Sequence, residues 1–314
     1  MRAAVLIFLI TMVPFVTGCG TSSKREVIFF HAGSLAVPVA RLAEGFEAQI
    51  PGIRIITEAA GSLVTARKIT ELGKPCDIMA SADYIIIDEL LIPEHASWNI
   101  GFATNEIVIA YTPRSGYSDE INSLNWTEIL LKGDVYYGRS DPDSDPCGYR
   151  TLLMLKLAEE YYDIPGLTGR FMEKDRSFIR PKEIDLTALL EARAVDYVFQ
   201  YKSVAVQHGL KYITLPPEIN LGNNEFRDNY RSVSVDVAGR SPGERMIIQG
   251  DYILYGITLV SNSPNRDDAV EFLAYILGPE GREIIRRTGQ NPVEPPVVSG
   301  SGELPVSVGN AVSR

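Results

Sequence analysis

The sequence predicts an α/β protein whose sheets are mainly parallel and flanked by helices. Short apolar strands alternate with helical patterns from residue 27 onward, which is typical of a parallel sheet covered by helices on both faces. The chain has 314 residues, and this length is enough for two compact lobes. A hydrophobic content of 45% and a charged content of 22% are those of an ordinary globular protein.

The first unit begins with three strands separated by helices. We expect the strands at Val27–Phe30, Ile53–Thr57 and Asp77–Ser81. Between these strands, apolar residues recur with a helical period and predict two helices. They are Leu35, Val39, Leu42 and Phe46 in the first helix and Leu63, Ala66, Ile69 and Leu72 in the second. Pro51-Gly52 ends the first of these helices.

The remaining elements predict a second unit and then a return to the first. A strand at Asn105–Tyr111 is expected at the crossing into this second unit. After it we expect a strand at Val135–Gly138, helices at Tyr149–Tyr161 and Ile184–Glu191, a strand at Val195–Tyr201, and returning strands at Tyr212–Leu215, Ser232–Val237 and Tyr252–Val260. We therefore assign residues 26–111 and 213–292 to lobe 1 and residues 112–212 to lobe 2. The tail, residues 293–314, has no helical period and is expected to be extended or disordered.

The N-terminus has the pattern of a lipoprotein signal. Arg2 precedes an apolar run from Ala3 to Val16, which is too short to span a bilayer comfortably. Small residues then lead to Cys19, as a secretory cleavage site requires. We expect residues 1–18 to be removed as a signal peptide. The lipid on Cys19 would then anchor the protein to the outer face of the cell membrane through the tether of residues 19–25.

Charge and cysteine content exclude two classes of site. The net charge is −10, which argues against a nucleic-acid partner, because such binding relies on a basic surface. Cys76 and Cys147 are the cysteines other than Cys19. They form no CxxC pair, which makes a zinc site improbable, and nothing in the sequence fixes the distance that a disulfide would require.

Two early strand-to-helix junctions carry the same pair of small residues, Gly33-Ser34 and Gly61-Ser62. Serine at such a place is often only a helix cap. In a parallel sheet, however, both junctions lie at the carboxyl ends of strands, which is the edge where ligands bind. Free N–H groups, a glycine and a serine hydroxyl at a helix N-terminus suit an oxyanion. The repetition therefore predicts a pocket for a small dianion that needs no lysine or arginine.

A third junction is rich in aspartate, over Asp141–Arg150. It can be explained as a proline-rich turn with an aspartate cap, and it lacks the central glycine and terminal glutamate of an EF-hand loop. Asp145 would ordinarily repel an anion. If it faces one, it acts either as a protonated donor or as a ligand to the central atom of that anion.

Six segments of the chain resemble the archaeal molybdate/tungstate-binding proteins of ABC importers. They are His31–Leu35 with Gly61-Ser62, Asp77–Tyr84, Asp145–Arg150, Tyr201–His208 and Leu215–Leu221. The resemblance runs from about residue 27 to residue 292. It implies a two-lobed type II periplasmic-binding-protein fold, with each lobe a mainly parallel sheet flanked by helices and with the ligand cleft between the lobes. It also implies a monomeric receptor, without a cofactor, that delivers the anion to a membrane permease and its ATPase.

The resemblance further implies which residues hold the anion. Ser34 and Ser62 would donate hydroxyl hydrogen bonds, and backbone N–H groups near Gly33 and Cys147 would donate more. Pro146, next to Cys147, is also expected among the ligand-binding residues. The oxyanion's metal would gain two carboxylate oxygens, and Asp145 corresponds to the first of them.

The second carboxylate is expected in the strand just before Tyr201, where this chain has Gln200. An amide oxygen is a poor ligand for a highly charged metal, although the amide N–H₂ can donate to an oxo group. Glu218 is a second candidate, from a nearby loop. Tyr201 is expected in the pocket wall and Arg150 in a salt bridge between the lobes.

Two other functions remain open at this point. A receptor of the same fold could bind sulfate, which gains nothing from Asp145, or phosphate, whose proton could be donated to that carboxylate. A serine hydrolase built on His31 and Ser34 is a remote alternative, because the chain has no G-x-S-x-G elbow.

Overall fold

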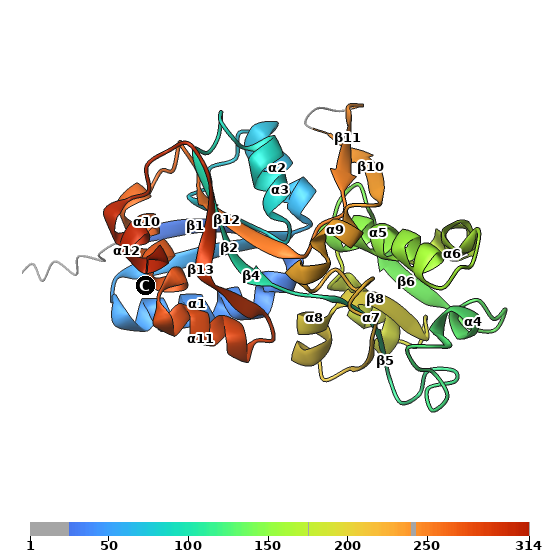
Figure 1. Cartoon of the computed structure of the whole chain (residues 1–314). Coiled ribbons are helices and arrows are strands. Elements are labelled where there is room, and N and C mark those ends of the chain that lie inside the picture. The colour runs from blue at the N-terminus through green and yellow to red at the C-terminus, as the bar shows by residue number, and fades with distance from the viewer. Residues whose placement is uncertain (1–24, 175, 240–242, 314) are drawn as a thin grey trace, which may run out of the picture.

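In the computed structural model the chain forms two α/β lobes that lie side by side (Figure 1). The structure describes residues 25–174, 176–239 and 243–313. The predicted signal peptide, Cys19 and nearly all of the predicted tether lie outside these residues. Within the described ranges, no helix is both long enough and apolar enough to cross a membrane.

The first lobe is built on a six-stranded sheet in the order β13-β4-β12-β3-β1-β2. Its strands are β1 (Arg25–Ala32), β2 (Ile53–Ala60), β3 (Ile78–Ser81), β4 (Trp98–Thr104), β12 (Leu254–Leu259) and β13 (Asn291–Gly300). Strand β1 is parallel to β2 and β3, whereas β12 is antiparallel to β3 and β4. The flanking helices are η1 (Gly33–Leu35), α1 (Ala36–Gln49), α2 (Ser62–Thr70), α3 (Tyr84–Leu90), α10 (Arg266–Leu277), α11 (Pro279–Arg287) and α12 (Val306–Val312).

The second lobe is built on a five-stranded sheet in the order β7-β6-β8-β5-β9. Its strands are β5 (Ile107–Tyr111), β6 (Tyr137–Ser140), β7 (Ile179–Arg180), β8 (Tyr197–Tyr201) and β9 (Lys211–Thr214). Strand β6 is parallel to β7 and β8, while β5 is antiparallel to β8 and β9. Its helices are α4 (Trp126–Leu130), α5 (Pro146–Tyr161), α6 (Leu167–Lys174), η2 (Arg176–Phe178), α7 (Asp185–Glu191) and α8 (Lys202–Gln207).

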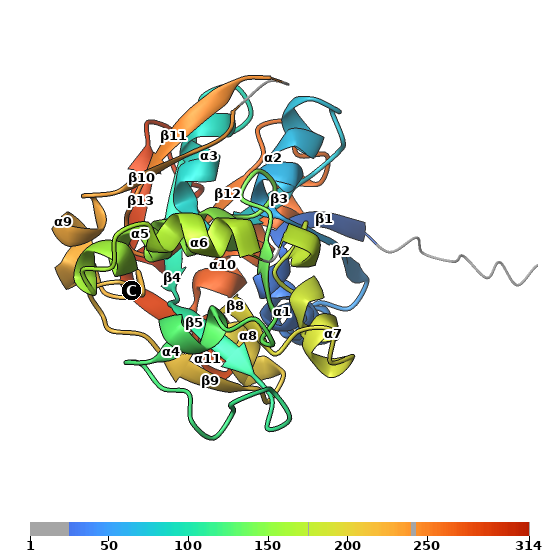
Figure 2. The same ribbon diagram turned by 90° about the vertical axis from the view of Figure 1, so that its right-hand side faces the viewer.

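The chain passes between the lobes in two places, from β4 to β5 and from β9 to β12. The second passage carries η3 (Asn224–Phe226), α9 (Arg227–Tyr230) and the hairpin of β10 (Ser234–Ala238) and β11 (Arg245–Gln249). The hairpin belongs to neither sheet; it projects above α9 and α5 in Figure 1 and lies at the upper left in Figure 2.

The structure confirms the two-lobed α/β class and corrects several details. Both sheets are mixed, because each includes strands that return antiparallel. Strand β5 was expected in lobe 1, but it pairs with β8 and β9 in the second sheet. The tail was expected to be extended or disordered. Its first part is extended, as the edge strand β13 beside β4, but its last part is the helix α12, which packs on α10. Cys76 and Cys147 are both free and buried.

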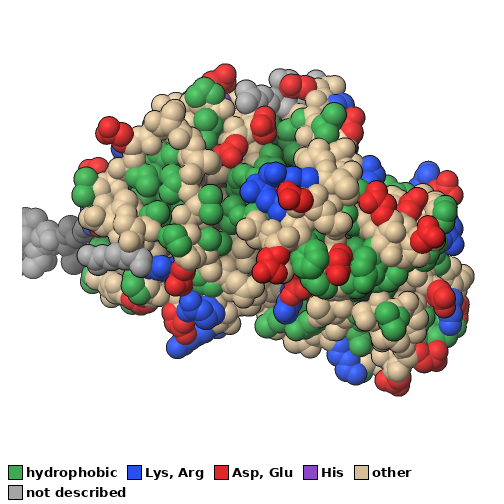
Figure 3. Space-filling model, in the orientation of Figure 1, with side chains coloured by type: hydrophobic (Ala, Val, Ile, Leu, Met, Phe, Trp, Pro, Cys, Tyr) green, Lys and Arg blue, Asp and Glu red, His purple; other side chains and the backbone are tan. Residues whose placement is uncertain are grey.

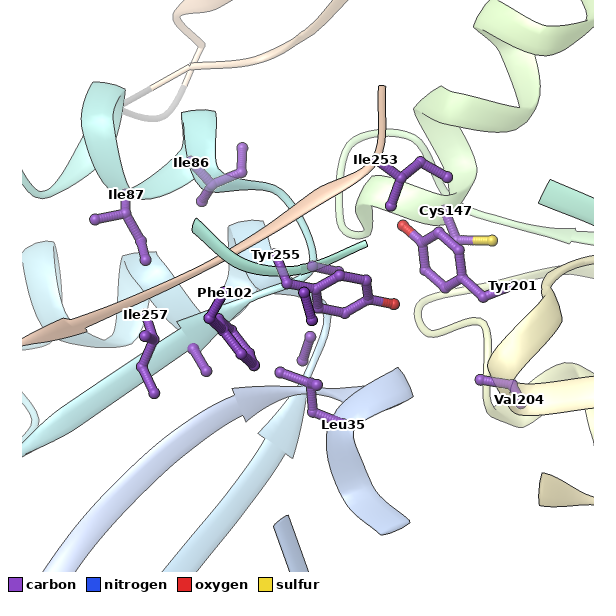
Figure 4. Close-up of a cluster of buried hydrophobic side chains, with 14 of the residues drawn as sticks. Leu35, Ile86, Ile87, Phe102, Cys147, Tyr201, Val204, Ile253, Tyr255 and Ile257 are labelled. Atoms are coloured by element: carbon purple, nitrogen blue, oxygen red, sulfur yellow. The ribbon is translucent and has the colours of Figure 1, made fainter. Parts of the chain in front are cut away.

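The two lobes share a continuous apolar core across their boundary. Tyr255 of the first lobe and Tyr201 of the second approach each other there, with ring centroids 5.9 Å apart (Figure 4). Both side chains are fully buried. On the face shown in Figure 3, acidic and basic side chains are interspersed over both lobes. The lobes therefore meet through a buried interior that is largely apolar but also contains charged side chains, among them Asp83 and Arg150.

Candidate functional site

Four strand-to-helix junctions converge where the lobes meet. The first lobe supplies Gly33-Ser34 after β1 and Gly61-Ser62 after β2. The second supplies Asp145 before α5 and Glu183 shortly before α7. A methyl group added at Gly33 would lie 3.1 Å from Glu183 Oε1, and one added at Gly61 would lie only 2.1 Å from the Ser144 carbonyl oxygen. These glycines therefore let the two lobes approach backbone to backbone.

Both serines that were predicted to donate to the anion lie where the four junctions meet, and each has a hydroxyl proton that is not used in the protein. Ser34 and Ser62 are buried. Ser34 Oγ accepts from the Tyr255 hydroxyl at 3.0 Å, and Ser62 Oγ accepts from the Ala82 N–H at 3.0 Å. Among the described residues, no acceptor is recorded for either serine proton. Because the oxygens are fixed and the protons are unused, both hydroxyls are set to donate.

Asn105, a residue in the connection between the lobes, sets the direction of the hydrogen bond from Tyr255 to Ser34. Asn105, in the first passage between the lobes, donates from Nδ2 to the Tyr255 hydroxyl at 3.0 Å and to Ser203 Oγ at 2.7 Å. Since the tyrosine oxygen already accepts from Asn105, its own proton is directed to Ser34. A chain of hydrogen bonds therefore runs from the hinge to one of the proposed donors.

Asp145 is held rigidly at the N-terminus of α5. Its Oδ1 accepts from the Cys147 N–H at 3.3 Å, and its Oδ2 accepts from the Glu183 N–H at 2.7 Å. Burial raises the pKa of Asp145 above its ordinary value, although these hydrogen bonds oppose the shift. The Cys147 N–H, expected to bind the ligand, thus has a partner in its own helix cap. Pro146 is buried at the first position of the same helix.

Glu183 is the site residue that the sequence reasoning missed. Its side chain is fully buried, and neither carboxylate oxygen has a hydrogen-bond partner among the described residues. Burial raises the pKa of Glu183 well above its ordinary value, and the neighbouring charge of Asp145 raises it further. An unpaired buried carboxyl group is costly unless it meets a ligand. The available signal was its position before a helix, at the same kind of junction as Ser34, Ser62 and Asp145.

Gln200 and Glu218, the two further candidates for contact with the anion, have partners within the protein. Gln200 donates from Nε2 to the Glu183 carbonyl oxygen at 2.9 Å, and its Oε1 accepts from the Tyr201 N–H at 3.2 Å. Its amide therefore supports the backbone of Glu183. Glu218 lies on the second passage between the lobes, where its charge acts on Tyr162 and Tyr230 and its carbonyl accepts from Asn229. Within the described ranges, no hydrogen bond is found between Glu218 and Asp145.

Tyr201 and Arg150 have the positions that the sequence predicted. Tyr201 is fully buried in the wall between the lobes, and its hydroxyl accepts from Arg150 at 3.1 Å. Arg150 forms a buried ion pair of 3.0 Å with Asp83 of the other lobe. It is therefore a salt-bridge partner between lobes, as expected.

His31 and Ser34 do not form a hydrolase dyad in this structure. The His31 ring nitrogen Nδ1 bonds to the Ala32 carbonyl at 2.8 Å, whereas Ser34 bonds to Tyr255. Burial lowers the pKa of His31 from 6.5 to about 4. The ring is thus a neutral, packed residue beside Phe29, with centroids 5.7 Å apart.

The lowered pKa of His31 predicts a stability loss in acid. Between pH 6.5 and about 4 the unfolded chain binds a proton that the folded protein does not, so the free energy of unfolding falls by ~3 kcal/mol over this window. We expect His31→Gln to remove this part of the slope, measured as urea unfolding of wild type and variant at each pH. The exposed His208→Gln is the control. A slope unchanged in His31→Gln contradicts the assignment.

Comparison with known proteins shows the family of this chain. A family model described as bacterial extracellular solute-binding protein matches residues 27–291. The chain belongs to this family of extracellular solute-binding proteins. It is 41% identical to the molybdate/tungstate-binding protein WtpA of Pyrococcus abyssi, with 96% of each chain covered. It is 40% identical to WtpA of Thermococcus kodakarensis, over 91% of this chain and 90% of the relative. The resemblance to the archaeal molybdate/tungstate-binding proteins is thereby confirmed.

Solved structures of other solute-binding proteins share the fold of this receptor. The periplasmic molybdate-binding protein of Azotobacter vinelandii aligns with a TM-score of 0.61 at 16% identity, covering 84% of this chain and 98% of its own. The sulfate-binding protein SubI of Mycobacterium tuberculosis aligns with a TM-score of 0.63 at 14% identity, covering 92% and 91%. At these identities the comparison shows the two-lobed fold alone.

Proposed function

We propose that this solute-binding protein captures tungstate or molybdate between its lobes and delivers it to the permease and ATPase of an ABC importer. The observation that carries the proposal is the pair of buried carboxyl groups, Asp145 and Glu183, opposite the hydroxyls of Ser34 and Ser62. The hydroxyls would donate to oxo groups, and the carboxylates would add oxygens to the metal. The likeness to the two WtpA proteins supports the same ligand.

The carboxyl pair argues against sulfate. Sulfur in sulfate gains no further ligands, so ionised carboxylates would repel this anion and only their protonated forms could donate to it. Phosphate is the stronger alternative, since a protonated phosphate oxygen could donate to Asp145 or Glu183. Glu183 would then be a hydrogen-bond acceptor. Tungstate and molybdate can use both carboxylates at once.

Calorimetric titration of the ligand-stripped protein with tungstate, molybdate, sulfate and phosphate tests the proposal. We expect tight binding of the first two anions and no binding of sulfate. Binding of phosphate in place of tungstate and molybdate would mean that the carboxylates accept a hydrogen bond from the anion and do not ligate a metal. If none of the four anions binds, the proposed pocket is wrong.

The serines supply a separate prediction. Ser34→Ala and Ser62→Ala each remove one hydroxyl donor to the dianion and should weaken tungstate binding by about 1–3 kcal/mol. The same titration measures the loss. Ser263→Ala, which removes a hydroxyl bonded to Asp77 at the far side of the first lobe, is the matched control. Wild-type affinity in both site variants would contradict this pocket.

We also propose that a lipid on Cys19 anchors the receptor, as a monomer, to the outer face of the membrane. The order of basic residue, apolar run and small residues before Cys19 supports this placement. Cys19→Ser should release the protein from membranes of an expression host that processes lipoproteins. Retention of that variant at the membrane would contradict the anchor.

A further inference from the structure

Two of the motifs that match the family, Asp77–Tyr84 and Asp145–Arg150, contain residues that the proposed pocket does not use. These residues meet across the lobe boundary. Arg150 Nη2 lies 3.0 Å from Asp83 Oδ2, and the Tyr149 hydroxyl donates to the same oxygen at 2.6 Å. Arg150 Nη1 also donates to the Ala82 carbonyl. Asp83 and Ala82 belong to the first lobe, and Tyr149 and Arg150 belong to the second.

This cluster satisfies the conditions under which a buried ion pair is favourable. The side chains of Arg150 and Asp83 are 3% and 4% exposed. The other carboxylate oxygen of Asp83 accepts from the Ile85 N–H at 3.1 Å, and Arg150 also donates to Tyr201. Desolvation is offset only where the geometry is good and the remaining hydrogen-bonding groups are satisfied, as they are here. Burial by itself lowers the pKa of Arg150, but the interactions with Asp83, Tyr201 and Tyr149 together outweigh burial and raise this pKa above its ordinary value.

Each half of the cluster is fixed within its own lobe. Asp83 caps helix α3 in the first lobe. Arg150 lies in helix α5, whose cap is Asp145. Opening of the lobes would separate all three contacts at once. Closing of the lobes would bring Asp145 opposite Ser34 and Ser62. The cluster therefore couples the position of the second lobe's carboxylate to that of the first lobe's donors.

We propose that Asp83, Tyr149 and Arg150 form an inter-lobe latch that closes the receptor without help from the ligand and sets how long the anion stays bound. The part concerning residence time rests on the proposed function. The latch contacts no oxo group, so it favours the closed state equally for any bound anion. These three are positioning residues, and the choice between anions belongs to Asp145 and Glu183.

The test measures two quantities on the full-length protein. One is the dissociation rate of tungstate by stopped flow, and the other is the radius of gyration of the ligand-free protein by small-angle X-ray scattering. Asp83→Asn is the first variant, because asparagine still caps a helix but carries no charge. Arg150→Met removes the partner, and Tyr149→Phe removes one hydroxyl without a change of shape. Arg286→Met, which breaks an exposed ion pair within the first lobe, is the matched control.

We expect Asp83→Asn and Arg150→Met to release tungstate at least about tenfold faster, and Tyr149→Phe to have a smaller effect. The ratio of tungstate to molybdate affinity should stay at the wild-type value. The ligand-free radius should increase in the same variants and not in Arg286→Met. The double variant Asp83→Asn/Arg150→Met should release tungstate no faster than the faster of the two single variants, because both substitutions break the same ion pair.

An unchanged radius, or an unchanged dissociation rate in a wild type that binds tungstate, overturns the latch. A shifted affinity ratio overturns it as well, because the cluster would then act on the anion directly. If the wild type does not bind tungstate, the proposed function fails. The ligand-free radius of gyration of the variants still tests whether the latch holds the lobes together.

Discussion

Replacing Glu183 by glutamine is expected to lower tungstate affinity by at least about a hundredfold, since even a residue that only supports a metal ligand contributes about 10- to 100-fold. Glu183 presents two carboxylate oxygens that have no partner among the described residues, beside Asp145. Glutamine preserves the shape but offers only an amide oxygen, which is a poor ligand for a highly charged metal. Calorimetry with tungstate and sulfate measures the effect, and any residual sulfate binding should not weaken.

Tungsten X-ray absorption supplies the structural readout of this prediction. The wild type should show more oxygen neighbours around tungsten than free tungstate has, and Glu183→Gln should show fewer than the wild type. Glu218→Gln is the matched control, because it removes a carboxylate that lies outside the site. An equal loss for tungstate and sulfate, or an equal loss in Glu218→Gln, would contradict ligation by Glu183.

The same substitution should change the pH dependence of the ligand-free protein. The pKa of Glu183 is raised in the folded state, so the folded protein keeps a proton that the unfolded chain has released. The free energy of unfolding therefore decreases as pH rises above the ordinary glutamate value of 4.5. Glu183→Gln should flatten this slope and leave the ligand-free protein more stable at neutral pH. A steeper slope in the variant would contradict the sign.

Gly61→Ala is expected to prevent closure of the lobes. The added methyl group would lie 2.1 Å from the Ser144 carbonyl oxygen and 2.9 Å from its carbon, both in the backbone of the other lobe. A rigid backbone cannot move aside as a flexible side chain does, so we expect about a hundredfold loss of tungstate affinity, near the upper end for overpacking. Gly61 has an ordinary φ of −59°, so alanine should not strain the first lobe itself.

Small-angle scattering and calorimetry together test this second prediction. With tungstate present, the Gly61→Ala protein should keep the larger radius of gyration of an open form, whereas the wild type has the smaller radius of the closed form. Gly133→Ala is the control, because nothing lies within 4 Å of the added methyl group there. Contraction of Gly61→Ala to the wild-type radius would mean that the lobes close in a different way.

Local pattern was enough for the strands and helices around the site. The apolar period of residues 35–46 predicted the buried face of α1, where Val39, Leu42 and Phe46 are indeed buried. The repeated Gly-Ser pair marked two junctions that the structure brings together. Both inferences succeed because helix period, strand length and junction chemistry depend on residues that are near neighbours in the chain.

The membership of strands in sheets could not be predicted in the same way. Strand β5 follows β4 after a short connection but pairs with β8 and β9, and the tail completes the first sheet as β13. Each of these pairings joins segments that are distant in sequence. A local pattern identifies a strand, whereas its partner depends on the packing of the whole lobe.

By itself, the sequence determined the α/β class, the strand-to-helix junctions that carry Ser34, Ser62 and Asp145, and the resemblance that points to an oxyanion receptor. Only the tertiary structure decided which carboxylate joins Asp145. It selects Glu183 because α7 and α5 start at the same edge of the second sheet, and it gives Gln200 the supporting role behind Glu183. The sequence states which functional group each side chain carries. Whether that group is buried, and whether it has a hydrogen-bond partner, is decided only when distant segments pack together.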